Sequence, residues 1–407
     1  MTAGNEAVLV TGLGATTPLG GDVDSTWAAM LAGESGITPL EAEWAADLPV
    51  RMAGRLKVDP SEVMGRVEAR RLDRCEQIAL IAARQAWEHA GRPEVEPERF
   101  AVAIGTGIGG VLTTLGQDDV LETSGVRRVS PHTVPMLMPN GPAAYVSMEF
   151  GARGGAHTPV SACASGAEAI ALGLDLIRLG RADVVIAGGT EACISALPLV
   201  GFANARAHSM RNDAPTEASR PFDVDRDGFV FAEGAALLVL ERADFAAARS
   251  ARVHATLAGA GITSDAGHIT AGSQDGQARA IRMALKSAGV SPEEIGLVHA
   301  HATSTPMGDI TEAGSVTEAI GTHPAVTATK SMTGHTFGAA GAIGAMAAIL
   351  ALREQVVPPT INLHQLDPQV KLDVVSGEAR KMQLNAALAN SFGFGGHNAA
   401  LVFTTAP

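Results

Sequence analysis

The chain of 407 residues is 46% hydrophobic and 18% charged, so it can bury one large core or two closely packed ones. Its formal net charge of −13 argues against nucleic acid as a partner, because phosphate backbones bind proteins with surplus Lys and Arg. The three cysteines, Cys75, Cys163 and Cys193, form no CxxC motif and no paired-histidine spacing accompanies them, so neither a disulfide framework nor a metal site is predicted.

The sequence also indicates no membrane-spanning segment. Its longest apolar stretch, 338–352, is short for a bilayer and rich in Gly and Ala, which favours a buried core helix. The first fourteen residues, MTAGNEAVLVTGLG, lack the basic and apolar regions of a signal peptide. We therefore expect a cytoplasmic protein that does not associate with a membrane.

Short apolar runs typical of buried strands alternate with longer periodic stretches typical of helices. In chain order, the predicted strands are 7–10, 100–104, 184–187, 235–240, 253–258, 295–299 and 399–403, and the predicted helices are 77–90, 167–179, 278–288 and 341–352. The first half of the pattern recurs in the second, which indicates a duplication. We expect an α/β fold with mixed sheets buried between helices, made of an N-terminal half, 1–250, and a C-terminal half, 251–407, that form one rigid unit.

Cys163 lies where a short extended run, 158–161, meets the predicted helix 167–179. The first turn of a helix presents free N–H groups and the positive end of the helix dipole, so a thiol there should have a lowered pKa and be a better nucleophile. The small residues on both sides of the cysteine leave room for a bulky acyl group. A buried structural cysteine is the alternative for this stretch taken alone.

Two histidine loops and one glycine-rich turn could complete a site with Cys163. The loop HAHATSTPMGD, 299–309, follows a predicted strand, and KSMTGH, 330–335, precedes the helix 341–352. In NSFGFGGHN, 390–398, glycines allow a tight turn with positive φ whose N–H groups point into a site, and the phenylalanine between them can swing or block. The alternatives are core histidines and an ordinary turn.

The segment DVDRDG, 223–228, resembles the start of a calcium-binding loop. The twelfth position is Gly234 rather than Glu, and Arg226 stands between the acids. We therefore expect a structural turn held by charge pairs rather than a calcium site.

Five motifs, VSACASGAEAI, RPFDVDRDGFVFAEGAALLVLE, HATSTPMGD, KSMTGH and NSFGFGGHN, together resemble the elongating type II class of β-ketoacyl-acyl-carrier-protein synthases, in their actinobacterial form. The resemblance covers essentially the whole chain, in the family's order and spacing. It implies a thiolase-like fold, a duplicated αβαβα five-layered sandwich, with the nucleophile in the N-terminal half and two catalytic histidines in the C-terminal half. It also implies a homodimer.

The activity implied by the resemblance is decarboxylative Claisen condensation of an acyl-enzyme with malonyl carrier protein in type II fatty acid elongation. Cys163 would be the nucleophile, His301 and His335 the catalytic histidines and Lys330 a supporting residue. The N–H groups of Cys163 and Phe394 would form the oxyanion hole. The other implied substrate contacts are Thr303 and Thr305 on the pantetheine arm, Ile108 and Phe202 along the acyl tunnel, Phe392, and Phe394 as a gate. No cofactor is implied beyond the phosphopantetheine of the carrier protein.

The implied partner is an acyl carrier protein. Carrier proteins are acidic, so this acidic enzyme needs a local basic surface. Arg70 and Arg71 at the end of MGRVEARR supply one, and Arg206 lies where the family places another docking base. A solvated helix face is the alternative for the arginine run.

One position departs from the family and keeps a second function open. The family usually carries a Glu that pairs with the lysine at the position of Gly344, so Lys330 lacks that partner here. Modular polyketide ketosynthases often have Gly there too. The alternative function is therefore a ketosynthase subunit of a type II polyketide synthase, which could form a heterodimer with a chain-length-factor partner. A biosynthetic thiolase would need a second reactive cysteine near the C-terminus, and a chain-length-factor subunit would lack Cys163.

Overall fold

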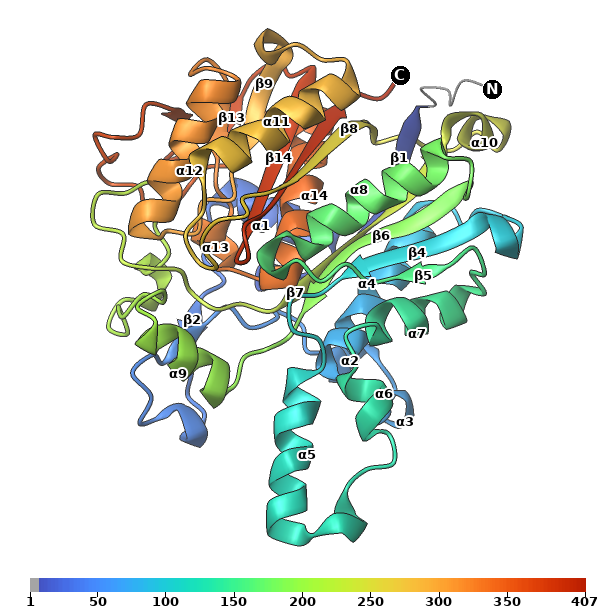
Figure 1. Ribbon diagram of the computed structural model, residues 1–407, viewed down its shortest axis with the longest axis vertical. Helices are drawn as coiled ribbons and strands as arrows, with labels where there is room; N and C mark the ends of the chain where they lie inside the picture. The colour runs from blue at the N-terminus through green and yellow to red at the C-terminus, as the bar shows by residue number, and fades with distance from the viewer. Residues whose placement is uncertain (1–6) are drawn as a thin grey trace.

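The computed structural model describes residues 7–407 and contains one large mixed sheet covered by helices (Figure 1). Residues 1–6 lie outside the described residues. They are the first part of the fourteen-residue stretch in which no signal peptide is predicted. The sheet has eleven strands in the order β12-β10-β9-β14-β15-β8-β1-β7-β6-β4-β5. Their bounds are β1 Val8–Thr16, β4 Phe100–Gly105, β5 Ala156–His157, β6 Val184–Glu191, β7 Gly234–Arg242, β8 Ala255–Ser264, β9 Ile295–His299, β10 Ala325–Thr327, β12 Asp373–Val374, β14 Ala386–Gly393 and β15 His397–Thr404.

Fourteen α-helices and two small strand pairs complete the part of the chain that the structure describes. The helices are α1 Val23–Ala32, α2 Pro60–Val63, α3 Arg66–Ala69, α4 Arg74–His89, α5 Val111–Ser124, α6 Thr133–Leu137, α7 Gly141–Phe150, α8 Ser165–Arg178, α9 Ala196–Asn204, α10 Ala243–Ala248, α11 Gln274–Ala288, α12 Pro306–Ala319, α13 Lys330–Thr333 and α14 Ala340–Glu354. The paired short strands are β2 Thr38–Pro39 with β3 Met52–Ala53, and β11 Val356–Val357 with β13 Arg380–Lys381.

The strand pairing repeats itself in the two halves of the chain. β4 pairs in parallel with β5 and β6, β6 pairs antiparallel with β7, and β7 pairs antiparallel with β1. In the same way, β9 pairs in parallel with β10 and β14, β14 pairs antiparallel with β15, and β15 pairs antiparallel with β8. The changeover lies between α10 and β8. This repeat agrees with the predicted duplication, and the domain boundary at residue 250 stays a prediction.

The predicted separate sheets are joined into one. Val8, Leu9 and Val10 of β1 pair antiparallel with Leu257, Thr256 and Ala255 of β8, so the first strand of each half closes the gap between them. Unpaired N–H and C=O groups at buried strand edges would be costly, and this pairing satisfies those of the three residue pairs.

Helices form layers on both sides of the sheet and between its two halves. α4 packs on β1 and β7, and α11 packs on β8 and β15, which gives the two outer layers. α8 packs on β4 and β6, α14 packs on β14, and these two helices contact each other in the middle layer (Figure 1). The result is the thiolase-like α/β sandwich that the sequence predicts.

α14 is the core helix expected from the apolar stretch 338–352. The segment Phe337–Glu354 is the only described one that is long and apolar enough to cross a membrane, and 89% of it is buried inside the molecule. Burial of this extent indicates a core helix of the sandwich.

α8 and α14 touch through glycines. A Cβ added to Gly166 would lie 2.6 Å from the carbonyl oxygen of Gly338, and a Cβ added to Gly341 would lie 2.8 Å from the backbone N of Ala167. Side chains at these positions would push the helices apart. The contact brings the N-terminal ends of both helices together, and with them Cys163 and His335.

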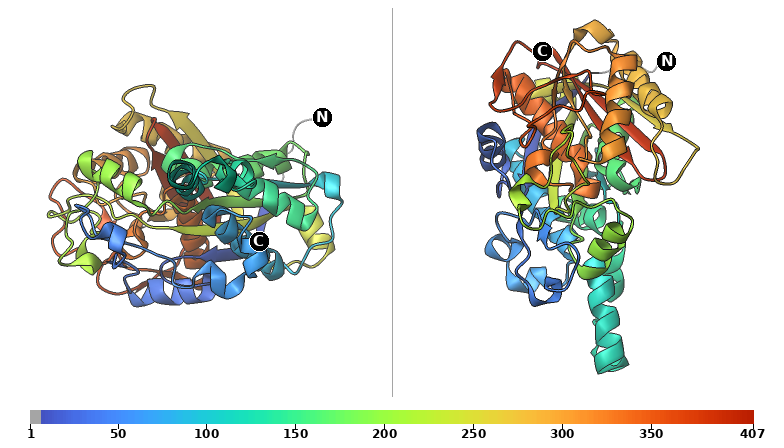
Figure 2. Two further views of the ribbon diagram at one scale, coloured as in Figure 1. Left: turned by 90° about the horizontal axis from the view of Figure 1, so that it is seen from below. Right: turned by 90° about the vertical axis from the view of Figure 1, so that its left-hand side faces the viewer.

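The predicted extended run 158–161 lies between β5, which ends at His157, and the 3₁₀ turn before α8, and it belongs to no strand of the described sheet. The segment from α5 to α6 was not predicted, and it projects from the body of the molecule as a helical arm (Figures 1 and 2). The apolar side chains of this arm, among them Leu121, Val126 and Val134, are exposed rather than packed in a core.

Gly341→Ala should lower the free energy of unfolding by about 1–3 kcal/mol, because the added methyl overlaps Ala167 in a packed core. Denaturant unfolding of the full chain measures the change. Gly201→Ala is the matched control, since this exposed glycine of α9 has open space at its Cβ position and should gain roughly 0.5–1 kcal/mol. Equal effects of the two substitutions would contradict the tight contact.

Candidate active site

A cavity of about 700 Å³ opens where the ends of α8, β9 and β14 meet. It is lined by most of the predicted site residues: Ile108, Cys163, Phe202, Arg206, His301, Thr303, Thr305, His335, Phe392 and Phe394. The halves of the sandwich therefore bring together motifs that are up to 286 residues apart in the chain, counted from Ile108 to Phe394.

Cys163 lies in a short 3₁₀ turn, Ala162–Ala164, that leads into α8. Ala162 has φ of 50°, a left-handed backbone conformation that makes the turn sharp. Sγ of Cys163 lies 3.0 Å from Nε2 of His335. The hydroxyl of Ser391 donates a hydrogen bond of 2.9 Å to the carbonyl oxygen of Cys163, which attaches the turn to β14.

The expected lowering of the Cys163 pKa is wrong for the resting site. Burial raises the pKa of the thiol to about 12 and outweighs the ammonium of Lys330 and the N–H groups of Phe394 and Cys163, which each lower it. Glu191 adds to the rise in pKa. The helix dipole acts on a thiol that has lost its water, so the resting site holds a neutral thiol beside an imidazole.

His301 is fixed by Lys330. Nζ of Lys330 donates to the carbonyl oxygen of His301 and lies 3.4 Å from its Nδ1. An ammonium only donates, so Nδ1 of His301 accepts and Nε2 carries the proton. Burial and then Lys330 hold the pKa of His301 and of His335 well below the ordinary value, so both imidazoles are neutral.

Glu312 was missed by the sequence analysis. This buried residue of α12 accepts hydrogen bonds of 2.8 Å from the N–H of His301 and 2.6 Å from the N–H of Ala302, and a further one from the amide of Asn390. Burial raises its pKa, and these hydrogen bonds oppose the rise. An acid three residues after Asp309 in the predicted histidine loop was the only available signal.

Glu191 was also missed. It ends β6, is fully buried, and accepts hydrogen bonds from Thr106, Gly107, Ile108 and Gly338. Burial raises its pKa to about 7. The carboxylate thereby fixes the loop that carries Ile108 and attaches it to the segment in front of α14.

The glycine-rich turn is shorter than predicted. Asn390–Gly393 belongs to β14, and the turn itself contains Gly395 with φ of 90° and Gly396 with φ of 72°. Phe394 is 39% exposed at the cavity, and its ring lies 6.2 Å from that of Phe202. The N–H of Phe394 faces Sγ of Cys163, as an oxyanion-hole donor would.

The three arginines predicted to dock the carrier protein lie in two different places. Arg206 lines the cavity, whereas the exposed Arg70 and Arg71 lie at the end of α3 and do not line it. Lys330 also lies behind the cavity wall, in contact with His301.

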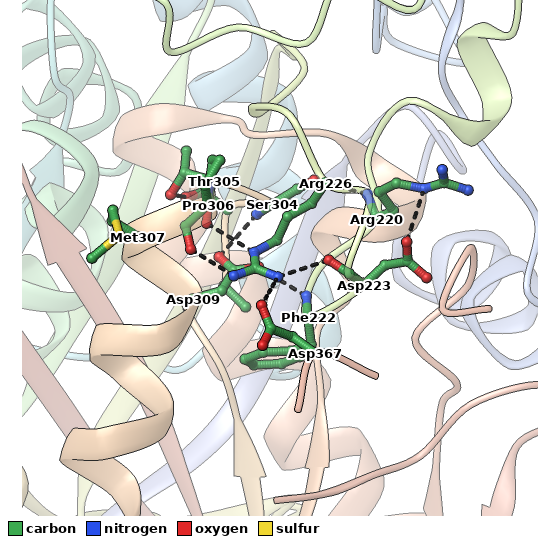
Figure 3. A network of polar contacts seen from close by, with 12 residues as sticks. Arg220, Phe222, Asp223, Arg226, Ser304, Thr305, Pro306, Met307, Asp309 and Asp367 are labelled. Carbon is green, nitrogen blue, oxygen red and sulfur yellow. Dashed lines mark hydrogen bonds and ion pairs between the residues drawn. The ribbon is translucent and has the colours of Figure 1, made fainter. Parts of the chain in front are cut away.

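The calcium-like segment is a structural turn. Arg226 forms ion pairs with Asp309 at 3.6 Å and Asp367 at 2.9 Å and donates to the carbonyl oxygen of Asp223 (Figure 3). Both Oδ1 and Oδ2 of Asp223 accept backbone N–H groups. These ion pairs hold the start of α12, and with it the loop that carries His301, against residues 223–228. Within residues 7–407, no cluster of His, Cys, Asp or Glu could hold a metal ion.

Comparisons with known proteins find matches along most of the chain. The profile of the beta-ketoacyl synthase N-terminal domain matches residues 5–246, and that of the C-terminal domain matches residues 254–364. The chain is 46% identical over 402 residues to 3-oxoacyl-[acyl-carrier-protein] synthase 2 of Mycobacterium tuberculosis strain H37Rv, covering 97% of this chain and 96% of the relative.

Solved structures with the same fold include two ketosynthases. The ishigamide ketosynthase/chain length factor has a TM-score of 0.93 and 33% identity, with 99% of this chain and 100% of that chain covered. A type II polyketide ketosynthase, solved in complex with its acyl-carrier protein and bound to the hexaketide, has a TM-score of 0.90 and 31% identity at the same coverage.

Alkylation of Cys163 by iodoacetamide should accelerate about tenfold per pH unit from pH 6 upward without reaching a plateau at neutral pH, because burial raises the pKa of the thiol to about 12. Lys330→Met should slow the reaction about tenfold at pH 7, since the ammonium lowers that pKa.

Mass spectrometry of the intact chain measures the rate. Cys163→Ser gives the background from Cys75 and Cys193, which are buried. A rate that is already constant between pH 6 and 7 would show a resting thiolate and contradict the prediction.

Proposed function

Because the chain belongs to the β-ketoacyl synthase family, an acyltransferase family of ketosynthases, we propose that the Cys163 cavity is where it performs this reaction. The reaction is the decarboxylative condensation of an acyl-enzyme thioester with malonyl carrier protein in type II fatty acid elongation. The observation that carries the residue assignment is the 3.0 Å approach of Cys163 Sγ to His335 Nε2, beside a second imidazole fixed by a buried lysine.

In the first step, an acyl group moves from the phosphopantetheine thioester to Cys163. Sγ bonds to the thioester carbonyl, the bond to the pantetheine sulfur breaks, and the thiol proton passes through Nε2 of His335 to that sulfur. The N–H groups of Cys163 and Phe394 donate to the oxyanion of the tetrahedral intermediate. A proton acceptor is needed because the thiol is neutral at rest.

In the second step, malonyl carrier protein occupies the cavity and loses CO₂. The electron pair of the broken bond forms an enolate, and its oxygen accepts hydrogen bonds from Nε2–H of His301 and, once the ring proton of His335 has moved from Nδ1 to Nε2, from Nε2–H of His335. The enolate carbon attacks the carbonyl of acyl-Cys163, and the 3-oxoacyl chain leaves on the carrier protein. Cys163 departs as a thiolate and takes a proton from solvent.

The remaining lining residues fit the parts of such a substrate. Thr303 and Thr305 present hydroxyls 3.1 Å apart beside His301, where a pantetheine amide would lie. Ile108 and Phe202 offer apolar surface to the acyl chain, with Phe392 packed against His301. Phe394 stands at the entrance, and its partial exposure suits a gate.

We propose acyl carrier protein as the partner, with no other cofactor needed, and a second copy of this chain as the subunit partner. Arg206 at the cavity and Arg70 and Arg71 on α3 offer basic docking points on an acidic enzyme. The projecting α5–α6 arm and the open edge of β5 supply apolar and strand surface for subunit association. A catalytic thiol favours the reducing cytoplasm.

A type II polyketide ketosynthase is the second candidate. A solved type II polyketide ketosynthase shares the fold at 31% identity, and a solved ketosynthase/chain length factor shares it at 33% identity. The chemistry at Cys163 would be the same, with a different acyl chain and a chain-length-factor subunit in place of the second copy.

Intact mass spectrometry after mixing with acyl carrier proteins from C4 to C18, and with one polyene chain, tests the function. We expect Cys163 to gain a saturated chain and malonyl carrier protein to discharge it as a chain two carbons longer. His301→Ala should load normally but lose the discharge by about 10²–10⁴-fold, because the enolate loses a donor.

Cys163→Gln is the control and should load nothing. Loading by the polyene chain alone would move the assignment to a polyketide pathway, and no adduct at Cys163 with any carrier protein would refute the proposed site. Native mass spectrometry of the same samples separates a homodimer from a chain that needs another subunit.

Reversing Arg206 and Arg70 to Glu should raise KM for acyl carrier protein about tenfold or more and leave KM for a short pantetheine thioester unchanged, because only the carrier protein brings an acidic surface. Steady-state kinetics at low ionic strength measure both constants. Arg92→Glu, at an exposed arginine after α4 that pairs with Glu88, is the control. Equal effects on both substrates would contradict a docking role.

A further inference from the structure

Lys330 is 95% buried, and among residues 7–407 no carboxylate lies within ion-pair distance of it. Within the same residues, the hydrogen-bonding partners of its ammonium are the carbonyl oxygen and Nδ1 of His301. Both carboxylate oxygens of the nearby Glu312 accept hydrogen bonds from backbone N–H groups. A buried ammonium without a paired anion is costly in free energy. Whether Lys330 keeps its proton therefore depends on the groups that surround it.

A buried histidine and a glycine face each other close to this lysine. His299 ends β9 and is 2% exposed, and its Nε2 lies 2.9 Å from the hydroxyl of Thr329, the residue before Lys330. A Cβ added to Gly344 of α14 would lie 2.8 Å from Nδ1 and 2.9 Å from Cε1 of this imidazole. No side chain at residue 344 can coexist with His299 in this position.

The same imidazole has an unused polar atom. Nδ1 of His299 is buried and has no hydrogen-bond partner among the described residues. A buried polar atom without a partner costs free energy, so packing alone does not account for a histidine here. Gly344 is the position at which the resemblance expects an acid paired with the lysine.

We propose that His299 fills the space in which an acidic side chain at residue 344 would pair with Lys330, so that Lys330 has no anionic partner and changes its charge within the working pH range. The proposal rests on the proposed function of Lys330. It predicts an enzyme whose activity falls on the alkaline side as the ammonium loses its proton.

The charged groups around Lys330 give the direction of this change. Burial lowers the pKa of Lys330 to about 8, and Glu312 of α12, the Cys163 thiol before α8 and Asp309 of α12 oppose that shift. The imidazoles of His299, His301 and His335 have lowered pKa values, each through burial first and Lys330 second, and stay neutral. Below pH 8 the ammonium favours ionised Cys163 and the enolate, and above it that stabilisation is lost.

The charge of Lys330 can be observed directly. The chain has five lysines, and the other four, Lys57, Lys286, Lys371 and Lys381, are exposed. NMR of the full chain labelled with [¹³Cε]lysine therefore gives a sparse spectrum, with the Lys330 signal assigned from Lys330→Met. We expect the Lys330 shift of the unmodified chain to titrate with a midpoint near pH 8.

A paired substitution tests the exchange of the imidazole for an acid. His299→Asn shortens the side chain but keeps a polar group for Thr329, and Gly344→Glu then supplies the carboxylate. The double variant should move the Lys330 midpoint and the alkaline fall in malonyl decarboxylation upward by at least one pH unit, a tenfold or larger gain in proton affinity. His299→Asn alone should leave the midpoint within a few tenths of a unit. Gly344→Glu alone should lower the melting temperature, because His299 blocks it.

A Lys330 midpoint above pH 10 in the unmodified chain would overturn the proposal, and so would an unchanged midpoint in a folded double variant. The NMR titration needs no turnover. If it succeeds while Cys163 accepts no acyl group, the proposed function fails and the inference about the charge of Lys330 stands.

Discussion

The contact between α8 and α14 is the constraint on which the site depends. Because Gly166, Gly338 and Gly341 carry no side chains, the two central helices approach until backbone meets backbone. Their N-terminal ends then lie close enough for Cys163 and His335 to touch. The outer helices and the sheet need only hold this pair of helices in place, and two different halves of the chain can therefore share one site.

Burial gives the site its chemistry and also sets its limits. The cavity wall removes water from the thiol, both imidazoles and Lys330, and each group moves toward its neutral form. Neutral imidazoles can donate hydrogen bonds to a developing enolate, and these hydrogen bonds stabilise its charge more in a site without water than in one exposed to water. The same burial makes the thiol a poor nucleophile at rest, so the Cys163–His335 contact has to transfer a proton before or during attack.

Much of this arrangement could be predicted from the sequence. The strands appear as short apolar runs, the helices as longer stretches with periodic apolar residues, and the reactive residues lie in distinctive loops. The duplication follows from the order of the predicted strands and helices, and the grouping of Cys163, His301 and His335 follows from the resemblance to the β-ketoacyl synthases. The raised thiol pKa could not be predicted, because it depends on water excluded by segments hundreds of residues away. Glu312 and Glu191 were missed because they act through backbone N–H groups, which leave no mark on the pattern of side chains.

The duplicated halves use the same device for different ends. The loop after β4 is fixed by Glu191 through the N–H groups of Gly107 and Ile108, and the loop after β9 is fixed by Glu312 through those of His301 and Ala302. Each central helix is also entered through a 3₁₀ turn. The first half places the cysteine at its turn and an apolar loop beside it, and the second places imidazoles in the equivalent region. A buried carboxylate that holds only backbone leaves the side chains of its loop free to diverge, so one scaffold could supply the nucleophile from one copy and the hydrogen-bond donors from the other.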